Sequence, residues 1–415
     1  MTMPDLKLNS RADINSYVEM AQNAGKGVIN PEVFYSKQLL DTIRYDASDY
    51  VYYRLADAAP IQEKADKIQI RRWAPLQAHT EPLEEGIPPK SDKGSVEKYE
   101  INAYQYGRYM EFTDKVSFAV VDPVIAHYTR EYTLVAMETL DLLAKDTLLS
   151  IANSYFAGAA VNFEALTVDS KPRMVDLRLI VLSLKKALVK PRSNGRFHVI
   201  ASPEFFYDMI SDPIVEKYMT INNTTKTMYD SSMLVPMFDM EFYESFLTPT
   251  SGEFIKDGKQ ALRIYRLNAS TQTYEFKTID EDTVVPGGSD KVFKTVSGYV
   301  KDVRTGDDAS YIPNQRIWDL AAYNAGDGST ATDGDWVEFK AQHVLIVGKD
   351  ALTKSGLSGE ESAKMYVKEK GSAGVLDPID QRQSIGFKIN SVGFGSTRLE
   401  AVVDYICVPS QVNAL

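Results

Sequence analysis

The side chains that most often carry chemistry are few in this sequence and lie far apart. A single cysteine, Cys407, excludes a disulfide scaffold and a cysteine-based zinc site. His127 and Glu131 are four residues apart on a predicted helix, a spacing that lets two side chains share a metal ion. An isolated pair of this kind is more typical of solvated or hydrogen-bonded side chains, which is what we expect here. The four histidines are His79, His127, His198 and His343.

The remaining candidates also favour structural roles. Asp280-Glu281-Asp282 lacks the spacing of a calcium loop and is expected to be a solvated turn. His198, inside an apolar run, is expected to be a satisfied histidine, buried or at a sheet edge, and Cys407 an inert core residue. Gly348-Lys349 has no upstream glycine for a phosphate loop, and the chain has neither a GxGxxG nor a GxSxG motif. The sequence therefore predicts no enzyme, no metal and no cofactor.

Composition excludes further classes of protein. The chain has 415 residues, 44% of them hydrophobic, enough for one large core or several domains. The net charge of −11 argues against a basic surface for nucleic acid. The 24 tyrosines suit half-hydrated contact surfaces. We expect neither a secretory signal nor a membrane span, because no apolar run has the required length.

Residues 67–115 are predicted to form a long hairpin that has no core of its own. Apolar and polar residues alternate over 67–73, as in a half-buried strand. Residues 81–94 are rich in Pro and Gly and form the tip, and residues 95–112 form the second strand of the hairpin. The alternation slips at Ala103, which suggests a bulge. Two strands with a loose tip are not stable alone in water, so the hairpin should lie on another surface.

That surface is expected to be protein. Arg71 and Arg72 beside Trp73 could stack on nucleic acid, but acids and bases are balanced across residues 67–115. Mixed charges with aromatic rings suit a contact with a neighbouring subunit. The predicted inter-subunit contacts are Arg71, Arg72, Trp73, Glu81, Glu84, Glu85, Tyr104 and Tyr106.

The other segments predict an α+β fold. Residues 1–60 read as an arm that packs on something else, with a short helix over 31–40. Asp122-Pro123 predicts the start of an unusually long helix that continues to about Tyr155. A second helix, from about 172 to 190, a strand at 196–201 and a helix from Ser202 follow, then a β-rich insertion over 252–335. The last strands are predicted at 342–350, 387–389 and 399–408.

Several stretches are similar to the N4-like major capsid family of tailed bacteriophages. Residues 106–114, followed by Asp122-Pro123 and Glu138-Thr-Leu-Asp141, resemble the junction between hairpin and long helix in that family. Residues 198–213 resemble its central strand and helix, and residues 343–351 and 371–388 its C-terminal third. The likeness covers roughly residues 69–212 and 339–408, and residues 252–335 match no pattern of the family.

The resemblance implies the HK-97-like fold, in which the hairpin is the extended E-loop and the long helix is the spine of the peripheral domain. It implies no active site, because the shared motifs are structural. The implied divisions are an N-terminal arm (1–60), the E-loop (61–115), a peripheral domain (116–168 and 376–415), an axial domain (169–251 and 336–375) and the β-rich insertion (252–335).

The resemblance also implies a function: a major capsid protein that self-assembles into pentamers and hexamers of an icosahedral shell around double-stranded phage DNA. Such a protein assembles in the host cytoplasm and resides in the virion. It encloses DNA without sequence-specific binding, contacts no membrane, and has scaffolding, portal and decoration proteins as candidate partners. Two alternatives stay open: an encapsulin-like nanocompartment shell, and a β-rich binding or adhesin module built on residues 252–335. An undetected hydrolase ranks third.

Overall fold

The computed structural model describes residues 50–58, 67–73, 76, 80, 82, 93–113, 124–192, 195–222, 236–268, 273–285, 288, 291–301, 308–326, 335–355, 364–368 and 382–410. The predicted arm helix at 31–40 lies outside these residues. Within them, no helix combines the length and apolar composition needed to cross a membrane.

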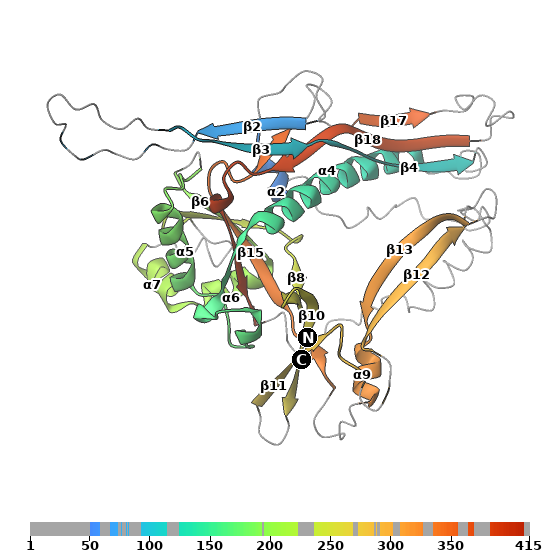
Figure 1. The fold of residues 1–415 in the computed structure, drawn as a ribbon. Helices are drawn as coiled ribbons and strands as arrows, with labels where there is room; N and C mark the ends of the chain where they lie inside the picture. Colours follow the sequence, from blue (N-terminus) through green and yellow to red (C-terminus); the bar gives the residue numbers. More distant parts are fainter. Residues whose placement is uncertain are drawn as a thin grey trace, which may run out of the picture.

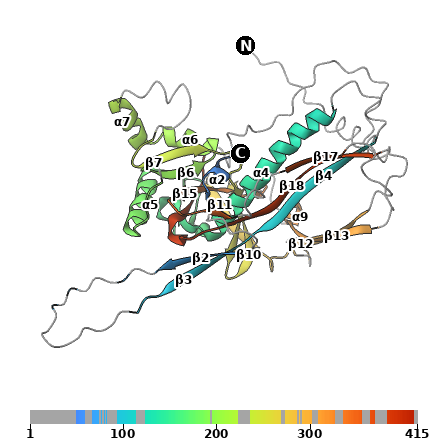
Figure 2. The ribbon, with the colours of Figure 1, turned by 90° about the horizontal axis from the view of Figure 1, so that it is seen from above.

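One long helix supports one long sheet. Helix α4 (Val124–Ile151) runs along strands β4 (Tyr104–Thr113) and β18 (Arg382–Gly395), as Figures 1 and 2 show. Apolar side chains of α4 and β18 form a separate hydrophobic cluster between them. The other strands of this five-stranded long sheet are β1 (Asp57–Ala58), β16 (Thr353–Ser355) and β17 (Lys364–Lys368).

A second, mixed sheet forms the main core. Its strand order is β5-β19-β15-β6-β7, with β8 beside β15. The parallel pairs are β5 with β19 and β6 with β7, and the others are antiparallel. The strands of this main sheet are β5 (Asn153–Phe156), β6 (Phe197–Ala201), β7 (Met240–Glu244), β8 (Thr250–Ser251), β15 (Ala341–Val347) and β19 (Val402–Cys407).

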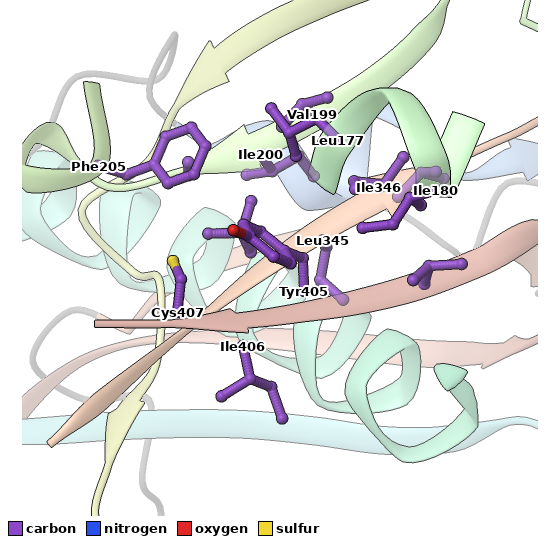
Figure 3. Packing of buried hydrophobic residues seen from close by; sticks show 14 of the residues in the cluster. Leu177, Ile180, Val199, Ile200, Phe205, Leu345, Ile346, Tyr405, Ile406 and Cys407 are labelled. Carbon is purple, nitrogen blue, oxygen red and sulfur yellow. The ribbon is translucent and has the colours of Figure 1, made fainter. Parts of the chain in front are cut away.

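Three helices accompany the main sheet: α5 (Met174–Lys186), α6 (Pro203–Ile210) and α7 (Pro213–Asn222). Figure 3 shows Leu177 of α5 and Phe205 of α6 packed against residues of β6, β15 and β19. Helix α6 begins as the sequence predicts, because the Ser202 hydroxyl accepts the backbone N–H of Phe205. Loss of water from these apolar side chains is the main force that stabilises the core.

The predicted insertion is β-rich as expected. Strands β9 (Glu253–Lys256), β10 (Lys259–Asn268), β11 (Thr273–Asp280) and β14 (Val337–Glu338) form one sheet. Strands β12 (Phe293–Lys301) and β13 (Asp308–Trp318) form a separate two-stranded ribbon that leads to helix α9 (Leu320–Gly326).

The remaining elements are short. Helix α2 (Val51–Arg54) precedes β1, and strands β2 (Lys67–Trp73) and β3 (Val96–Asn102) pair only with each other among the described strands. Three single turns of 3₁₀ helix are η2 (Ala157–Ala159), η3 (Phe163–Ala165) and η5 (Leu399–Ala401).

Two predicted helix boundaries were wrong. The long helix ends at Ile151 rather than near Tyr155, because residues from Asn153 onward extend and pair with β19. The second helix ends at Lys186 rather than Lys190, where the chain turns through Leu188 in a left-handed conformation. In both places a tertiary contact or a turn overrides the local preference for helix.

Candidate functional site

The β2–β3 hairpin is the element that the sequence singles out for function. Seven cross-strand pairs join its strands, from Lys67 opposite Asn102 to Trp73 opposite Val96. Arg72 lies opposite Glu97, whereas Arg71 lies opposite Lys98. Figures 1 and 2 show the two strands projecting from the body of the molecule. The hairpin therefore presents a mixed-charge surface with little support from its own chain.

The base of the hairpin is fixed by a close crossing over β18. Ile101 is buried against Gly395, where a Cβ atom would lie 2.7 Å from the Ile101 side chain. A Cβ atom at Gly393 would collide with the backbone carbonyl of Asn102. Glycine at both positions lets β3 cross the end of β18 at backbone contact.

Arg72, next to the outer end of β2, ties the hairpin to the segment after β18. Its Nη1 donates to the carbonyl oxygen of Thr397 at 3.5 Å and lies 3.9 Å from the Glu400 carboxylate. Glu400 also lies 4.0 Å from Nε of Arg398, whose Nη2 donates to the carbonyl oxygens of Ala187 and Leu188. A line of polar contacts thus connects the hairpin to the C-terminal end of α5.

The six predicted contact residues that precede β3 fall into three groups. Arg71 and Trp73 are exposed, Trp73 at 74%, as a surface for association requires. Arg72 is half-buried and bonded within its own chain. The side chains that lie outside the described residues are those of Glu81, Glu84 and Glu85.

Tyr104 and Tyr106 do not lie in the hairpin, which corrects the predicted course of the return strand. The chain breaks at Ala103, and β4 then pairs with β18 instead of β2. Tyr106 is half-buried against the α4–β18 cluster, and this burial raises the pKa of its phenol. Tyr104 remains exposed, opposite Val392. Tyr106 therefore packs into its own subunit.

The side chains that could have done chemistry occupy structural positions. Asp280 accepts hydrogen bonds from the Asp282 amide and the Thr283 hydroxyl, while Lys259 and Lys291 pair with Asp282, as in a solvated turn. Within the described ranges, no three His, Cys, Asp or Glu side chains gather closely enough to hold a metal ion.

Cys407 is a buried core residue as predicted, whereas His198 differs from its prediction. Cys407 is fully buried, and burial raises the pKa of its thiol well above the ordinary value. His198 is buried as expected, but neither ring nitrogen has a hydrogen-bond partner among the described residues, and the Glu241 carboxylate lies 3.6 Å from Nε2. Burial lowers the pKa of His198 to about 4, so the ring is neutral at pH 7. The expectation of a satisfied histidine was wrong, because the apolar strand offers it no partner.

Sequence reasoning missed two features of this region. Asp141 of α4 is buried, and its Oδ1 accepts the backbone N–H of Tyr53 at 2.8 Å, which caps helix α2. The outer face of α5 carries exposed Val175, Leu179 and Leu182. The spacing of residues 175, 179 and 182 indicates an apolar stripe along a helix, but the sequence does not show whether such a stripe is exposed or buried.

No protein-family model matches the sequence, and no curated protein matches it either. Solved structures match over nearly the whole chain. The capsid of cyanophage P-SCSP1u is 11% identical with a TM-score of 0.52 and covers 90% of this chain and 91% of that chain. The capsid of Ralstonia phage GP4 is 11% identical, with a TM-score of 0.52, over 94% and 98%. The capsid of Helicobacter pylori bacteriophage KHP30 is 9% identical, with a TM-score of 0.51, over 98% and 99%. The chain therefore has the fold found in phage capsid structures.

Proposed function

We propose that this chain is the major capsid protein of a tailed bacteriophage, of the N4-like branch with the HK-97-like fold. The observation that carries the proposal is the shared fold, which extends over at least 90% of this chain and of each of the three phage capsid chains. The N4-like assignment is supported by the sequence stretches at 106–114, 198–213, 343–351 and 371–388.

In this proposal, copies of the chain form pentamers and hexamers of an icosahedral shell around double-stranded DNA. The β2–β3 hairpin contacts a neighbouring copy through Arg71, Trp73 and the carboxylates Glu81, Glu84 and Glu85. A hairpin with an exposed outer end gains stability only when another surface covers it. Closed symmetry repeats each contact many times, so modest contact energies suffice for a stable shell.

The remaining parts of the proposal follow from the same fold. The proposed divisions are the N-terminal arm (1–60), the E-loop (61–115), a peripheral domain with α4 (116–168 and 376–415), an axial domain with α5, α6 and α7 (169–251 and 336–375), and the insertion with β9–β13 and α9 (252–335). The net charge of −11 suits a wall that holds DNA without condensing it, since phosphates and carboxylates repel. The shell is assembled in the host cytoplasm, has scaffolding, portal and decoration proteins as candidate partners, and performs no catalysis.

Electron microscopy of the purified chain tests the proposal directly. Closed icosahedral shells are expected, and particles from virus-producing cells should contain the chain together with nuclease-protected DNA. Shells that hold protein cargo and no DNA would favour the encapsulin-like alternative. A chain that stays monomeric under all assembly conditions, while its residues 252–335 bind a ligand, would favour the binding module.

Deletion of residues 84–93 tests the role of the hairpin. The shortened chain should be soluble and folded, because no described core side chain belongs to this segment, but it should form no closed shells. Circular dichroism and the thermal midpoint serve as the control for folding. Normal shells from the shortened chain would show that the hairpin tip is not a clamp between subunits.

A further inference from the structure

Helix α5 carries apolar side chains on two opposite faces. Its inner face is buried in the main core through Met174, Leu177, Ile180, Val181 and Leu184. On the outer face, Val175, Leu179 and Leu182 are 47%, 48% and 48% exposed, at a spacing that places them in one stripe. Figures 1 and 2 show α5 at one side of the molecule. A helix that is apolar on both faces is normally buried on both, so the outer stripe indicates a surface that another molecule covers.

The residue that ends α5 gives a second, independent indication. Leu188 has a φ of 58°, and its amide donates to the carbonyl oxygen of Lys185 at 3.0 Å. The next amide, of Val189, donates to the carbonyl oxygen of Leu184 at 3.0 Å. Glycine is the usual residue at this position of a helix end, because a side chain is strained there. Leu188 is 79% exposed, so burial among the described residues does not offset the strain, whereas a contact outside the chain would.

The segment around α5 is strongly basic, although the chain as a whole is acidic. Residues 171–196 contain eight Lys and Arg and one Asp, a formal charge of +7, whereas the whole chain carries −11. The one acid, Asp176, is buried, and its Oδ2 accepts hydrogen bonds from the Tyr405 hydroxyl and the Gly158 amide, both at 3.1 Å. This carboxylate is therefore used inside the fold. The surface of the segment attracts anions.

The cations at the end of α5 are the ones available to a partner. Lys186 and Lys190 are exposed, and within the described part of the chain neither has a carboxylate partner. Exposed Lys349 lies beside Lys190, whose carbonyl oxygen accepts the Lys349 amide at 3.0 Å. Lys185, by contrast, pairs with Asp239. We call the exposed apolar and basic positions the α5 face: Val175, Leu179, Leu182, Lys186, Leu188 and Lys190.

A partner for the α5 face must cover the apolar stripe and also neutralise the lysines. Nucleic acid offers phosphates to the lysines but leaves the apolar side chains in water. A purely apolar surface covers the stripe but leaves Lys186 and Lys190 without counter-charges, which is costly when they lose water. A protein segment that carries both apolar side chains and carboxylates meets both needs.

We propose that the α5 face binds an acidic amphipathic helix of another protein. Apolar side chains of that helix, spaced three and four residues apart, pack on Val175, Leu179 and Leu182, which have the same spacing. Its carboxylates pair with Lys186 and Lys190, and these opposite charges fix the register of the two helices. The inference goes beyond the proposed function, because the partner is not a copy of this chain and the face is present before assembly.

Binding of a synthetic helix to the unassembled, full-length chain tests the proposal. The probe is a fluorescent peptide of about 20 residues, about 30 Å of helix, with leucines along one face and alanines and glutamates on the others. Fluorescence anisotropy measures its binding. A peptide of the same composition with its leucines spread around the helix should bind about tenfold more weakly or less. A peptide with glutamine in place of glutamate should behave in the same way.

Variants of the stripe test the apolar contact. Leu179→Ser with Leu182→Ser should fold normally, because both side chains are exposed, and should weaken binding of the probe about tenfold or more. Val161→Ser with Ile255→Ser is the matched control. It removes two other exposed apolar side chains and should bind the probe like the native chain.

Charge reversal tests the polar contact. Lys186→Glu with Lys190→Glu should weaken binding about tenfold or more and remove most of its dependence on salt concentration, because salt screens exposed charges. Lys98→Glu with Lys388→Glu changes the net charge of the chain by the same amount at two other exposed lysines. This control should retain nearly the affinity of the native chain.

Leu188→Gly separates contact from folding. Glycine relieves the strained backbone, so the thermal midpoint of the unassembled chain should rise, whereas affinity for the probe should fall. A fall in the thermal midpoint together with unchanged affinity would show that Leu188 serves the fold and not a partner, which would remove it from the α5 face and count against the inference.

Three results would overturn the inference. One is a probe that does not bind, or that binds all α5 variants equally. Another is preferential binding of a DNA duplex of about 20 base pairs that Leu179→Ser with Leu182→Ser leaves unchanged, which would identify a nucleic-acid surface. The third is a Lys186→Glu, Lys190→Glu chain that fails to form shells by itself, which would place a second copy on this face. Each result leaves the proposed function standing, because that function is tested by shells of the native chain.

Discussion

Asp141 shows how one side chain joins distant parts of the chain. Its carboxylate lies on α4, yet it caps α2, whose N-cap residue, Tyr50, makes no side-chain cap. Oδ2 of Asp141 is buried and has no hydrogen-bond partner within the part of the chain that the structure describes. Burial raises the pKa of Asp141 to about 6, although the Tyr53 and Tyr52 amides and nearby Lys145 act in the opposite direction. The folded chain therefore favours the protonated form.

Asp141→Asn should stabilise the unassembled chain at pH 7.5 and make little difference at pH 4. The folded pKa lies above the ordinary value of 3.8, so the stability linked to protonation is full below that value and is lost as pH rises through about 6. An asparagine keeps an acceptor for the Tyr53 amide without the buried charge. The gain at pH 7.5 should be on the order of 2 kcal/mol, measured by urea unfolding at a series of pH values.

Asp146→Asn is the control for this measurement. Asp146 lies on the same helix, is exposed, and has an ion pair with Lys145 at 3.4 Å. Its replacement should change stability by less than about 1 kcal/mol at every pH. If Asp141→Asn were destabilising at pH 7.5 and neutral at pH 4, the negative charge itself would be needed at the α2 cap.

At the scale of residues, local signals could be predicted and long-range ones could not. Ser202-Pro203 marks the start of α6 because a cap acts within three residues. The partner of Asp141 is 88 residues away, so no local pattern reveals it. The same reason explains why His198 was expected to find a hydrogen bond, and why no local pattern reveals the contact between Arg72 and Thr397.

At the scale of elements, the existence of strands was predictable but their pairing was not. Residues 104–112 alternate in the same way whether they return along β2 or join β18. The slip at Ala103 was correctly taken as an irregularity, and the structure shows that the chain changes sheet there. The choice of β18 depends on the cluster that Tyr106 joins beneath α4, which only the tertiary fold provides.

The crossing of β3 over β18 leads to a prediction about glycine. Gly393→Ala should lower the free energy of unfolding by about 1–3 kcal/mol, because the new methyl group collides with the Asn102 backbone. The hairpin should also become more sensitive to proteases, since the collision separates β3 from its support. Chemical denaturation and limited proteolysis measure the two effects.

Gly94→Ala provides the control within the same hairpin. A Cβ atom there meets nothing within 4 Å, so the substitution should change stability by less than about 0.5 kcal/mol. Equal behaviour of the two variants would mean that the crossing at Gly393 is not tight in solution.

At the scale of the whole molecule, the β-rich insertion is bound into the main core. Tyr265 of β10 belongs to the main cluster, and its ring lies 5.9 Å from that of Phe339. The buried Arg263 donates to the carbonyl oxygen of Phe163 at 2.5 Å and lies over the rings of Phe276 and Phe339. Burial lowers the pKa of Arg263 to about 10, so it remains a cation at neutral pH. Side chains of the insertion thus form part of the main hydrophobic core.

Replacing residues 252–335 by a short linker should therefore destabilise the entire chain. The loss of the Tyr265, Phe254 and Phe276 side chains from the core should lower the free energy of unfolding by about 5 kcal/mol or more. Shortening only the β12–β13 ribbon, by linking Phe293 to Trp318, should have little effect, because these strands pair only with each other among the described strands. Chemical denaturation curves of both variants measure the free energy of unfolding. Unchanged stability after removal of the whole insertion would show that it does not contribute to the main core.

The candidate site was only partly predictable, because the sequence does not show which surfaces stay exposed in the folded chain. Trp73 and Arg71 were identified because a hairpin without a core must expose its side chains. The exposed apolar residues on the outer face of α5 escaped notice because apolar residues on a helix indicate burial, and the sequence does not show what would cover them. Residues that become buried on association therefore have the apolar pattern of core residues in the sequence. In the structure of a single chain the same residues are exposed apolar side chains.

The three tryptophans occupy very different surroundings. Trp336 is 2% exposed with Arg266 and Lys277 over its ring, and Trp318 donates its indole N–H to Glu253. The indole of Trp73, at the end of the hairpin, is open to water. A dissolved quencher such as iodide can therefore reach Trp73 far more readily than Trp336. The hairpin carries its own fluorescent reporter, and its covering by another molecule can be followed optically without attaching a dye.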